Sequence, residues 1–473
     1  MCRKDNIAYG GGDVMRWWLY SKQEDVKTRI PSIVIILGYF IAIALGVILQ
    51  ISNWSENRQV NFSFFVLAVF IPVSIVSTLL FIIRMAFSMP VHYAETRKYI
   101  AKQHKYALKR YARKHLAIAA WSVITPLEQP ALNLLNLEGE FPLAPKTPLK
   151  IAMDDLFDQT RNEQVFTRLL APMADMLKSN DFRNIETAVW VSGSDQTCVE
   201  ELKRSLERLT LPGVSRGKID YLPVCPDYAL IDKWLGATEA SPVNRLLIVI
   251  DMHSEDSGSK SMESASAFLL THSSKRLDGV KPVYLYQPMT GVTEVEEKMT
   301  VYLDVESVPA AKTLWFTGLS RAEKYPLLEA LDSKGLASER LDIDASLGEK
   351  SAGYRWLSVA LAADAVKYAQ GNQLVAASDN NQFAIVALSS RQTPLPEKYE
   401  WIFWNIPYLH GVIAGLFCGI TIVLFEACFT SAKNMPSLWV FLFSASFPLL
   451  IFATIGFFFT QLITHQACED MGN

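Results

Sequence analysis

The stretch PSIVIILGYFIAIALGVILQI, residues 31–51, decides what kind of molecule this chain forms. It carries no charged side chain and is long enough to cross a hydrocarbon core of roughly 30 Å. Because lipid offers no partner to backbone N–H and C=O groups, such a run is expected to be a membrane-spanning helix. Three further runs have the same character: 62–83, 407–425 and 438–463. We therefore predict two transmembrane hairpins, 31–83 and 397–463, on either side of a water-soluble region.

Basic residues are distributed unequally around these runs. Lysines and arginines are frequent from Arg84 to Lys114, whereas the short connectors within the two hairpins hold one basic residue each, Arg58 and Lys433. Since positive residues are retained on the cytoplasmic side of a membrane, we predict a bacterial-type inner-membrane protein with its central domain in the cytoplasm. The tails 1–30 and 464–473 would also be cytoplasmic.

The basic segment 84–115 has an amphipathic character. Apolar residues such as Tyr99, Ile100 and Tyr106 are interleaved with its lysines and arginines. A juxtamembrane helix of this kind can lie against anionic headgroups, which would make membrane lipids one of the partners of this chain. The alternative is a solvated helical continuation of the second span, and the sequence leaves both open.

The region 116–396 alternates between strand and helix signals. Short β-branched or apolar runs, typical of strands, lie at 188–191, 219–224, 245–250, 267–270, 283–286, 313–316 and 383–388. Helical periodicities lie at 164–177, 199–209, 228–235, 325–331 and 354–368. Strands that alternate with helices of about ten residues favour an α/β domain with a largely parallel sheet.

Composition and motifs exclude several classes of function. The formal net charge of -3 gives no electrostatic reason to expect a nucleic-acid partner. Neither G-x-x-x-x-G-K-[ST] nor G-x-G-x-x-G occurs, so no phosphate-cradling loop is indicated, and H-E-x-x-H is missing as well. The six cysteines form no C-x-x-C pair, which predicts neither a disulfide framework nor a zinc site. We expect no cofactor and no metal.

From about Ile219 to Leu388, the order of elements resembles the thiolase-like superfamily, particularly the β-ketoacyl synthases. The strand 219–224 leads into Cys225, at the place of that family's nucleophilic cysteine, and 264–270 is similar to the small-residue stretch that enters its next strand. The segment LGEKSAG (347–353), the helix after it and the strand 380–388 resemble the family's closing glycine–histidine, small-residue helix and final strand. The resemblance implies a thiolase-like domain whose cysteine thiolate is stabilised by a helix N-terminus.

Two positions of the family's catalytic pattern carry other residues in this chain. Condensing enzymes use two histidines, or a histidine and an asparagine, to hold the thioester oxyanion. The first place is taken here by Leu319 or Ser320 and the second by Glu349, whose carboxylate would repel a developing enolate. The histidines His253 and His272 match neither place. The resemblance is therefore to a catalytically degenerate member.

The remaining candidates have ordinary structural explanations. Cys225 and Cys198 are the only candidate nucleophiles, and Cys198 is expected to be a half-buried residue in the first turn of a helix. The run Asp251 to Asp256 follows a strand end, where ligands often bind in α/β sheets, although an ordinary acidic loop is the simpler interpretation. Four other acidic residues are expected to be surface charges: Asp154, Asp155, Asp342 and Asp344.

These observations predict a non-enzymatic docking or adaptor platform for a protein partner. The arrangement also resembles uncharacterised inner-membrane proteins associated with type VI secretion, which implies a secretion-system component as that partner. Two alternatives stay open: an acyl-processing enzyme of the thiolase or ketoacyl-synthase type that uses Cys225 or Cys198, and an immunity-type membrane protein. The sequence is also compatible with a homo-oligomer.

Overall fold

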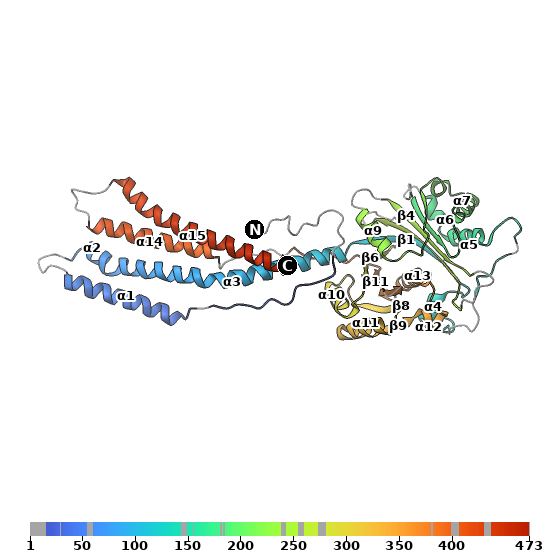
Figure 1. Ribbon diagram of the computed structural model, residues 1–473, viewed down its shortest axis with the longest axis horizontal. Coiled ribbons are helices and arrows are strands. Elements are labelled where there is room, and N and C mark those ends of the chain that lie inside the picture. The colour runs from blue at the N-terminus through green and yellow to red at the C-terminus, as the bar shows by residue number, and fades with distance from the viewer. Residues whose placement is uncertain are drawn as a thin grey trace. The chain divides into compact units, whose positions relative to one another are not determined.

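The computed structural model describes residues 16–28, 30–53, 60–142, 149–154, 156–179, 182, 185–237, 243–253, 260–272, 281–379, 382–398, 406–429 and 437–472. The chain divides into two compact units (Figure 1). The helical unit is formed mainly by Leu19–Lys105 and Lys398–Asn473. The α/β unit is formed by Tyr106–Glu397 together with Val14–Trp18.

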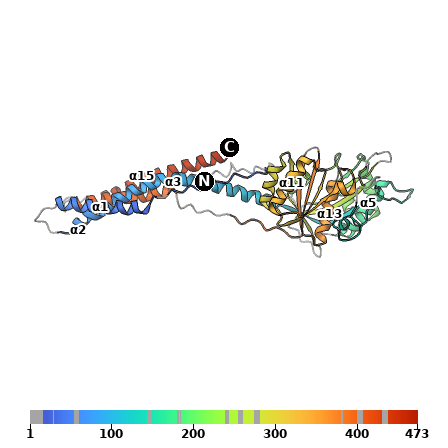
Figure 2. The ribbon, with the colours of Figure 1, turned by 90° about the horizontal axis from the view of Figure 1, so that it is seen from below.

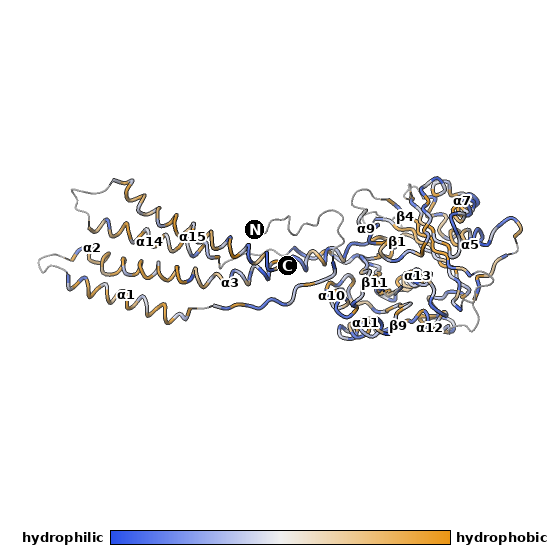
Figure 3. Tube along the Cα trace, in the orientation of Figure 1, coloured by the Kyte–Doolittle hydropathy of each residue, from blue (hydrophilic) through white to orange (hydrophobic). Residues whose placement is uncertain are grey.

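The described part of the helical unit contains four helices that are long and apolar enough to cross a membrane. They begin with α1 (Ser32–Asn53) and end with α14 (Pro407–Phe429) and α15 (Leu438–Gly472). The second is continuous from Phe62 to Ala112 and consists of α2 (Phe62–Phe65), a π-helical segment (Val66–Phe70) and α3 (Ile71–Ala112). Figure 3 shows that apolar residues dominate these helices. All four predicted runs are thus helical, which supports a membrane protein.

Two of these helices extend beyond the apolar runs. The basic segment 84–115 continues α3 as far as Ala112, and a helical backbone is what both interpretations of this segment expect. The predicted tail after residue 463 is also helical, because α15 extends to Gly472. Cys468 of α15 is disulfide-bonded, whereas the sequence predicted no disulfide framework.

Helices α14 and α15 pack backbone against backbone. Figure 1 shows them side by side, and Figure 2 gives the same ribbon from below. Gly411, Gly415 and Gly419 follow one another at four-residue intervals and so share one face of α14. A Cβ at Gly415 would lie 2.7 Å from the Cα of Leu449 in α15. Such close approach is open to small residues, and it allows dispersion contacts along the whole hairpin.

The α/β unit is built on one mixed sheet. Its strands are β1 (His115–Ile124), β2 (Ile185–Val191), β3 (Ile219–Tyr221), β4 (Asn244–Asp251), β5 (Ser264–His272), β6 (Val283–Tyr286), β7 (Met289–Val292), β8 (Ala311–Thr317), β9 (Glu339–Asp342), β10 (Asn372–Asp379) and β11 (Gln382–Ser389). Their order across the sheet is β3-β2-β4-β5-β1-β6-β11-β10-β8-β9, with β7 paired to β11. The prediction of a largely parallel sheet is therefore wrong. The hairpins β4–β5 and β10–β11 are antiparallel, and β1 and β6 pair in the same way with β5 and β11.

The sheet consists of two halves with the same topology. Read from its outer edge, the first half runs β3-β2-β4-β5-β1 and the second runs β9-β8-β10-β11-β6. In both halves the outer two pairings are parallel and the inner two are antiparallel. The halves join through the antiparallel pair β1–β6, in which Leu116 faces Leu285. The repeated order indicates an internal duplication, which the sequence analysis did not detect.

Helices cover the sheet and bury its apolar side chains. The helices of this unit are α4 (Pro130–Leu134), α5 (Arg161–Leu170), α6 (Ala174–Lys178), α7 (Cys198–Arg208), α8 (Pro212–Ser215), α9 (Ala229–Ala237), α10 (Val295–Val305), α11 (Arg321–Lys334), α12 (Ile343–Leu347) and α13 (Tyr354–Lys367). Leu247 and Val249 of β4 pack in one core with α9 and α13, whereas Leu246 and Ile248 pack in another with α5 and α7. This alternation follows from the period of two in a strand.

Helix α13 is central to the unit. Nearly every residue along it is buried, including Trp356, Leu357 and Leu361. Its hydrophobic core contains side chains of strands from both halves, such as Phe268 of β5 and Val386 of β11. A helix that is buried on all sides is fixed in position, so the residues at its beginning are held accurately in place.

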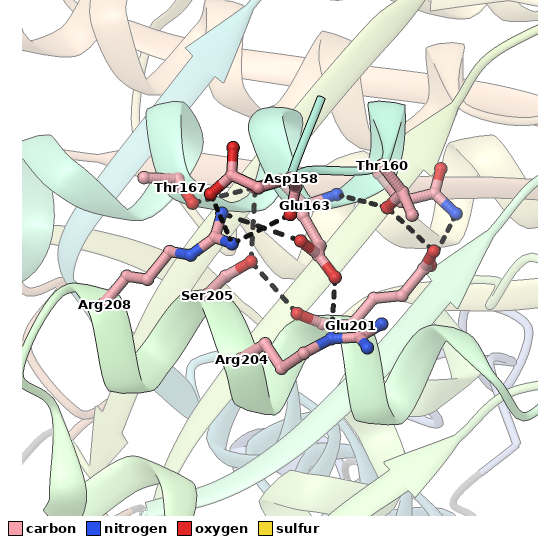
Figure 4. A network of polar contacts seen from close by, with 9 residues as sticks. Asp158, Thr160, Glu163, Thr167, Glu201, Arg204, Ser205 and Arg208 are labelled. Carbon is pink, nitrogen blue, oxygen red and sulfur yellow. Dashed lines mark hydrogen bonds and ion pairs between the residues drawn. The ribbon is translucent and has the colours of Figure 1, made fainter. Parts of the chain in front are cut away.

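A buried carboxylate joins α5 to α7 (Figure 4). Thr160 caps α5 by accepting a hydrogen bond from the backbone N–H of Glu163 at 3.2 Å. The Glu163 side chain, only 2% exposed, forms ion pairs with Arg204 at 2.7 Å and Arg208 at 3.6 Å. The two ion pairs offset part of the free-energy cost of desolvating this carboxylate between the helices.

Candidate functional site

The carboxyl ends of two strands meet the beginning of α13 in one polar cluster. β4 ends at Asp251 and β10 ends at Asp379, and these strands hold corresponding places in the two halves of the sheet. The cluster therefore contains one carboxylate from each half of the sheet. We refer to it as the α13 cluster, and its side chains are Cys225, Asp251, Lys350, Ser351, Arg355 and Asp379.

Asp251 occupies the N-terminus of α13. Its Oδ2 accepts a hydrogen bond from the backbone N–H of Gly353 at 2.8 Å and another from the hydroxyl of Ser351. The side chain is only 3% exposed. A Cβ at Gly353 would lie 2.5 Å from the Cβ of Asp251, so this approach requires glycine. The positive end of the α13 dipole is thus occupied by a carboxylate of the chain itself.

Cys225 lies beside the same helix end but outside any helix. It precedes α9, which begins at Ala229, and its thiol donates a hydrogen bond to the carbonyl oxygen of Ala352 at 3.3 Å. Burial raises the pKa of the Cys225 thiol to about 12, and the nearby Arg355 only partly opposes this effect. The family resemblance predicted a thiolate at a helix N-terminus. The structure instead gives a neutral thiol next to a helix end that Asp251 already occupies.

The two cations of the cluster are held by carboxylates and carbonyls. Arg355 lies 3.5 Å from Asp379, and Lys350 lies 3.7 Å from the same carboxylate. Arg355 also donates to the carbonyl oxygen of Pro226 at 3.2 Å, and Trp356 donates to this oxygen at 2.8 Å. The first turn of α13 therefore fixes the segment that carries Cys225.

The first position expected for a catalytic histidine has a structural role. Thr317 is the last residue of β8 and Gly318 follows it, and the two donate hydrogen bonds to Asp344 at 2.7 and 2.6 Å. Burial raises the pKa of Asp344, although these two hydrogen bonds oppose the shift. The prediction that Asp344 is a surface charge is wrong, since its carboxylate is partly buried and bonded on both oxygens. Ser320 is the N-cap of α11 and forms a capping box with Glu323.

Glu349, at the second position expected for a catalytic histidine, is a surface residue. Glu349 is 66% exposed and pairs with Lys260 at 3.6 Å. The carboxylate is consequently a surface group, and it is not placed to repel an enolate at Cys225. The carboxylates within the cluster are those of Asp251 and Asp379, and the sequence analysis interpreted Asp251 as part of an acidic loop.

The other candidates fall outside the cluster. Cys198 is fully buried at the beginning of α7, and burial raises the pKa of its thiol to about 11. His253 lies 3.0 Å from Ser261, while His272 ends β5 opposite Leu116. Among the hydrogen bonds found within the described residues, none joins a histidine to Cys225.

The remaining acidic candidates are structural. Asp154 pairs with Arg168 at 2.6 Å on the surface, as predicted for a surface charge. Asp342 caps α12 and pairs with Lys324 at 2.8 Å. Asp155 and residues 254–259, which belong to the predicted acidic loop, lie outside the described residues. Within the described part, no group of three or more histidine, cysteine or carboxylate side chains could hold a metal ion.

No protein-family model matches the chain, and no curated protein matches it. Among solved structures it is similar to a type II polyketide ketosynthase in complex with its acyl-carrier protein, at 11% identity and a TM-score of 0.42, over 59% of this chain and 99% of that one. It is also similar to 3-oxoacyl-[acyl-carrier-protein] synthase III from Aquifex aeolicus VF5, at 11% identity and a TM-score of 0.36, over 58% and 99%. The enzyme of the same name from Pseudomonas aeruginosa PAO1 gives 14% identity and a TM-score of 0.37, over 58% and 98%.

These solved structures are thiolase-like condensing enzymes, and the likeness concerns the fold alone. The predicted fold class, an α/β domain flanked by two pairs of apolar helices, is confirmed by the architecture itself. The chemistry of the α13 cluster has to be judged from its own residues.

Proposed function

We propose that this chain is a non-enzymatic, membrane-anchored docking protein whose α/β domain binds a protein partner at the membrane surface. The observation that supports this most is the carboxylate of Asp251 bonded to the N-terminus of α13. A helix N-terminus can stabilise a developing oxyanion only where its N–H groups are available. With a carboxylate already bonded there, additional negative charge would be repelled.

The state of Cys225 supports the same conclusion. A thiol with a pKa of about 12 is ionised to only about one part in 10⁵ at pH 7, and the thiolate is the nucleophile in acyl transfer. The hydrogen bonds of Asp251 with Ser351 and Gly353 give the cluster an internal structural purpose, because they join β4 of the first half to the beginning of α13, which belongs to the second half. This is the arrangement expected of a scaffold.

The two connections to the helical unit give the docking proposal its physical basis. The α/β unit is joined to apolar helices both through α3 and through the chain that leads to α14. Two tethers restrict the orientation of a domain more than one, and they raise the effective concentration of a partner that is itself at the membrane. Following the sequence resemblance, we propose a component of type VI secretion as the partner, with the inner membrane as its location.

The central experiment replaces Cys225 by alanine in the full chain and tests complementation of a deletion strain. We expect full function at normal protein level, and no adduct of the wild type with an acyl-thioester probe. Cys198→Ala provides the matched control, because that thiol is also buried and neutral but lies outside the cluster. Loss of function confined to Cys225→Ala, or an acyl adduct on Cys225, would instead support the acyl-processing enzyme.

A second experiment separates docking from anchoring. A released fragment, residues 94–397, should fold and bind the partner but fail to complement the deletion. Complementation by this fragment at native level would contradict the platform and favour a diffusible activity.

A further inference from the structure

A groove of about 690 Å³ runs along α3 in the helical unit. One wall is the extended segment that precedes α1, and the other is α3 itself, with His410 of α14 at one side. The extended segment is held at two points. The hydroxyl of Thr28 donates to the carbonyl oxygen of Phe87 at 3.1 Å, and Lys98 forms an ion pair with Asp25 at 2.6 Å. The groove is therefore formed by specific contacts within one unit.

Polar groups with unused hydrogen-bonding capacity line this groove. Arg84 has no ion pair among the described residues, and its guanidinium lies over the ring of Phe81 at 5.9 Å. The ring of His410 packs against the same Phe81 at 6.2 Å between centroids. The Nδ1 of His410 is buried and has no hydrogen-bond partner in the described part of the chain. A guanidinium and an imidazole are thus brought together by one aromatic ring.

The position of Arg84 along the helix indicates what could meet it. It is the first charged residue after the apolar run 62–83, so in a bilayer it lies at the level of the lipid phosphates. Lys98, whose charge Asp25 already neutralises, lies about 21 Å further along the helix at a rise of about 1.5 Å per residue. The end of the groove next to the apolar run therefore keeps a cation that the chain does not neutralise.

We propose that this groove binds the phosphate group of a membrane phospholipid. The Arg84 guanidinium donates charge-assisted hydrogen bonds to the phosphate oxygens, and His410 donates from its ring. Phe87 and Val91 line the groove on the headgroup side of Arg84, whereas the acyl chains run in the other direction, along the apolar residues that precede Arg84. The carboxylates of Glu24 and Glu95 line the groove further along α3, on the headgroup side of Arg84, and they disfavour a headgroup with additional negative charge. Phosphatidylethanolamine is consequently the probe of choice.

The test uses the full-length protein, purified in detergent and freed of lipid, and native mass spectrometry to count bound lipid. We expect adducts with dioleoylphosphatidylethanolamine and none with dioleoylglycerol, which has the same acyl chains but no phosphate. Arg84→Gln should lower the phospholipid adduct about fivefold, the change expected when one basic residue's attraction to a headgroup is lost. Arg84→Lys, which keeps the charge, should retain most of it.

The matched control is Lys105→Gln, which removes one positive charge from the same helix outside the groove. It should bind phospholipid as the wild type does, and circular dichroism should show equal helix content in all variants. Three results would overturn the proposal: equal adducts with the diacylglycerol, unchanged binding by Arg84→Gln, or equal losses in Arg84→Gln and Lys105→Gln. Displacement of the lipid by excess inorganic phosphate would also overturn it, since it would assign the site to free phosphate.

Discussion

Replacing Asp251 by alanine should destabilise the α/β unit by about 1–3 kcal/mol. Loss of a helix cap costs about 0.5–2 kcal/mol. Here the lost cap leaves the buried N–H of Gly353 without its acceptor, so the cost is that of an unsatisfied buried donor, about 1–3 kcal/mol. Because the side chain is only 3% exposed, water cannot easily take its place.

Asp251→Asn is the comparison that separates charge from hydrogen bonding. It keeps the size and one acceptor oxygen, and it loses chiefly the interaction of the charge with the α13 dipole, about 0.3–1 kcal/mol. Urea unfolding of the full chain in detergent micelles, followed by pulse proteolysis of the α/β unit, measures both variants. A capped helix should lose at least about 0.5 kcal/mol when its cap is removed. If the free energy of unfolding of Asp251→Ala is within that value of the wild type, the capping role is refuted. If Asp251→Asn destabilises the unit as much as Asp251→Ala does, the charge of the carboxylate, and not its hydrogen bonds, provides the stability.

Four further outcomes are expected. At pH 8 Cys225 should react with iodoacetamide about 1,000-fold more slowly than an ordinary thiol, because its pKa is about 12 instead of 9.0. Mass-spectrometric mapping of the labelled cysteines checks this rate. Burial raises the pKa of Asp364, so its ionised form is disfavoured in the fold and its contribution to stability falls as pH rises above about 4, the usual range of an aspartate. Asp364→Asn, which can still accept from Trp121 Nε1, should therefore gain stability relative to the wild type between pH 4 and pH 7 in urea unfolding series, and a constant difference would contradict this. Gly415→Leu should separate α14 from α15 and lower the yield of monodisperse protein in detergent, whereas Gly38→Leu, at a position with open space, should not. Glu163→Ala should cost about 1–2 kcal/mol in the same unfolding assay, because it removes two ion pairs with partly exposed arginines, each of which contributes about 0–1 kcal/mol.

The fold could be predicted from the sequence wherever local pattern determines it. The four apolar runs are helices because nothing else satisfies their backbone in lipid, and β6 coincides with the predicted 283–286. β1 was missed, since it directly follows the basic segment and its alanine-rich sequence has no clear alternation. The antiparallel pairs of the sheet were missed as well. Whether neighbouring strands run parallel depends on how the chain returns, and periodicity carries no information about that.

The candidate site could be predicted only in part. Cys225 and Asp251 attract attention because each follows a strand-like run, and the structure places both in the α13 cluster. Arg355 and Asp379 were missed because they are separated in sequence and meet only when α13 lies across the sheet. Gly353 belongs to the segment that resembles the thiolase-like family. The reason for a glycine at this position is the close approach of Asp251, which only the structure shows.

The central place of β1 has a mechanical consequence. α3 ends at Ala112 and β1 begins at His115, so a load applied to the membrane anchor passes almost directly into this strand. β1 is hydrogen-bonded to β5 on one side and to β6 on the other, and β6 is also paired to β11, from which the chain leaves for the second anchor. Edge strands can be peeled away one bond at a time, whereas an interior strand must break two ladders together. Tension between a bound partner and the bilayer would consequently be borne by the part of the sheet that resists unfolding best.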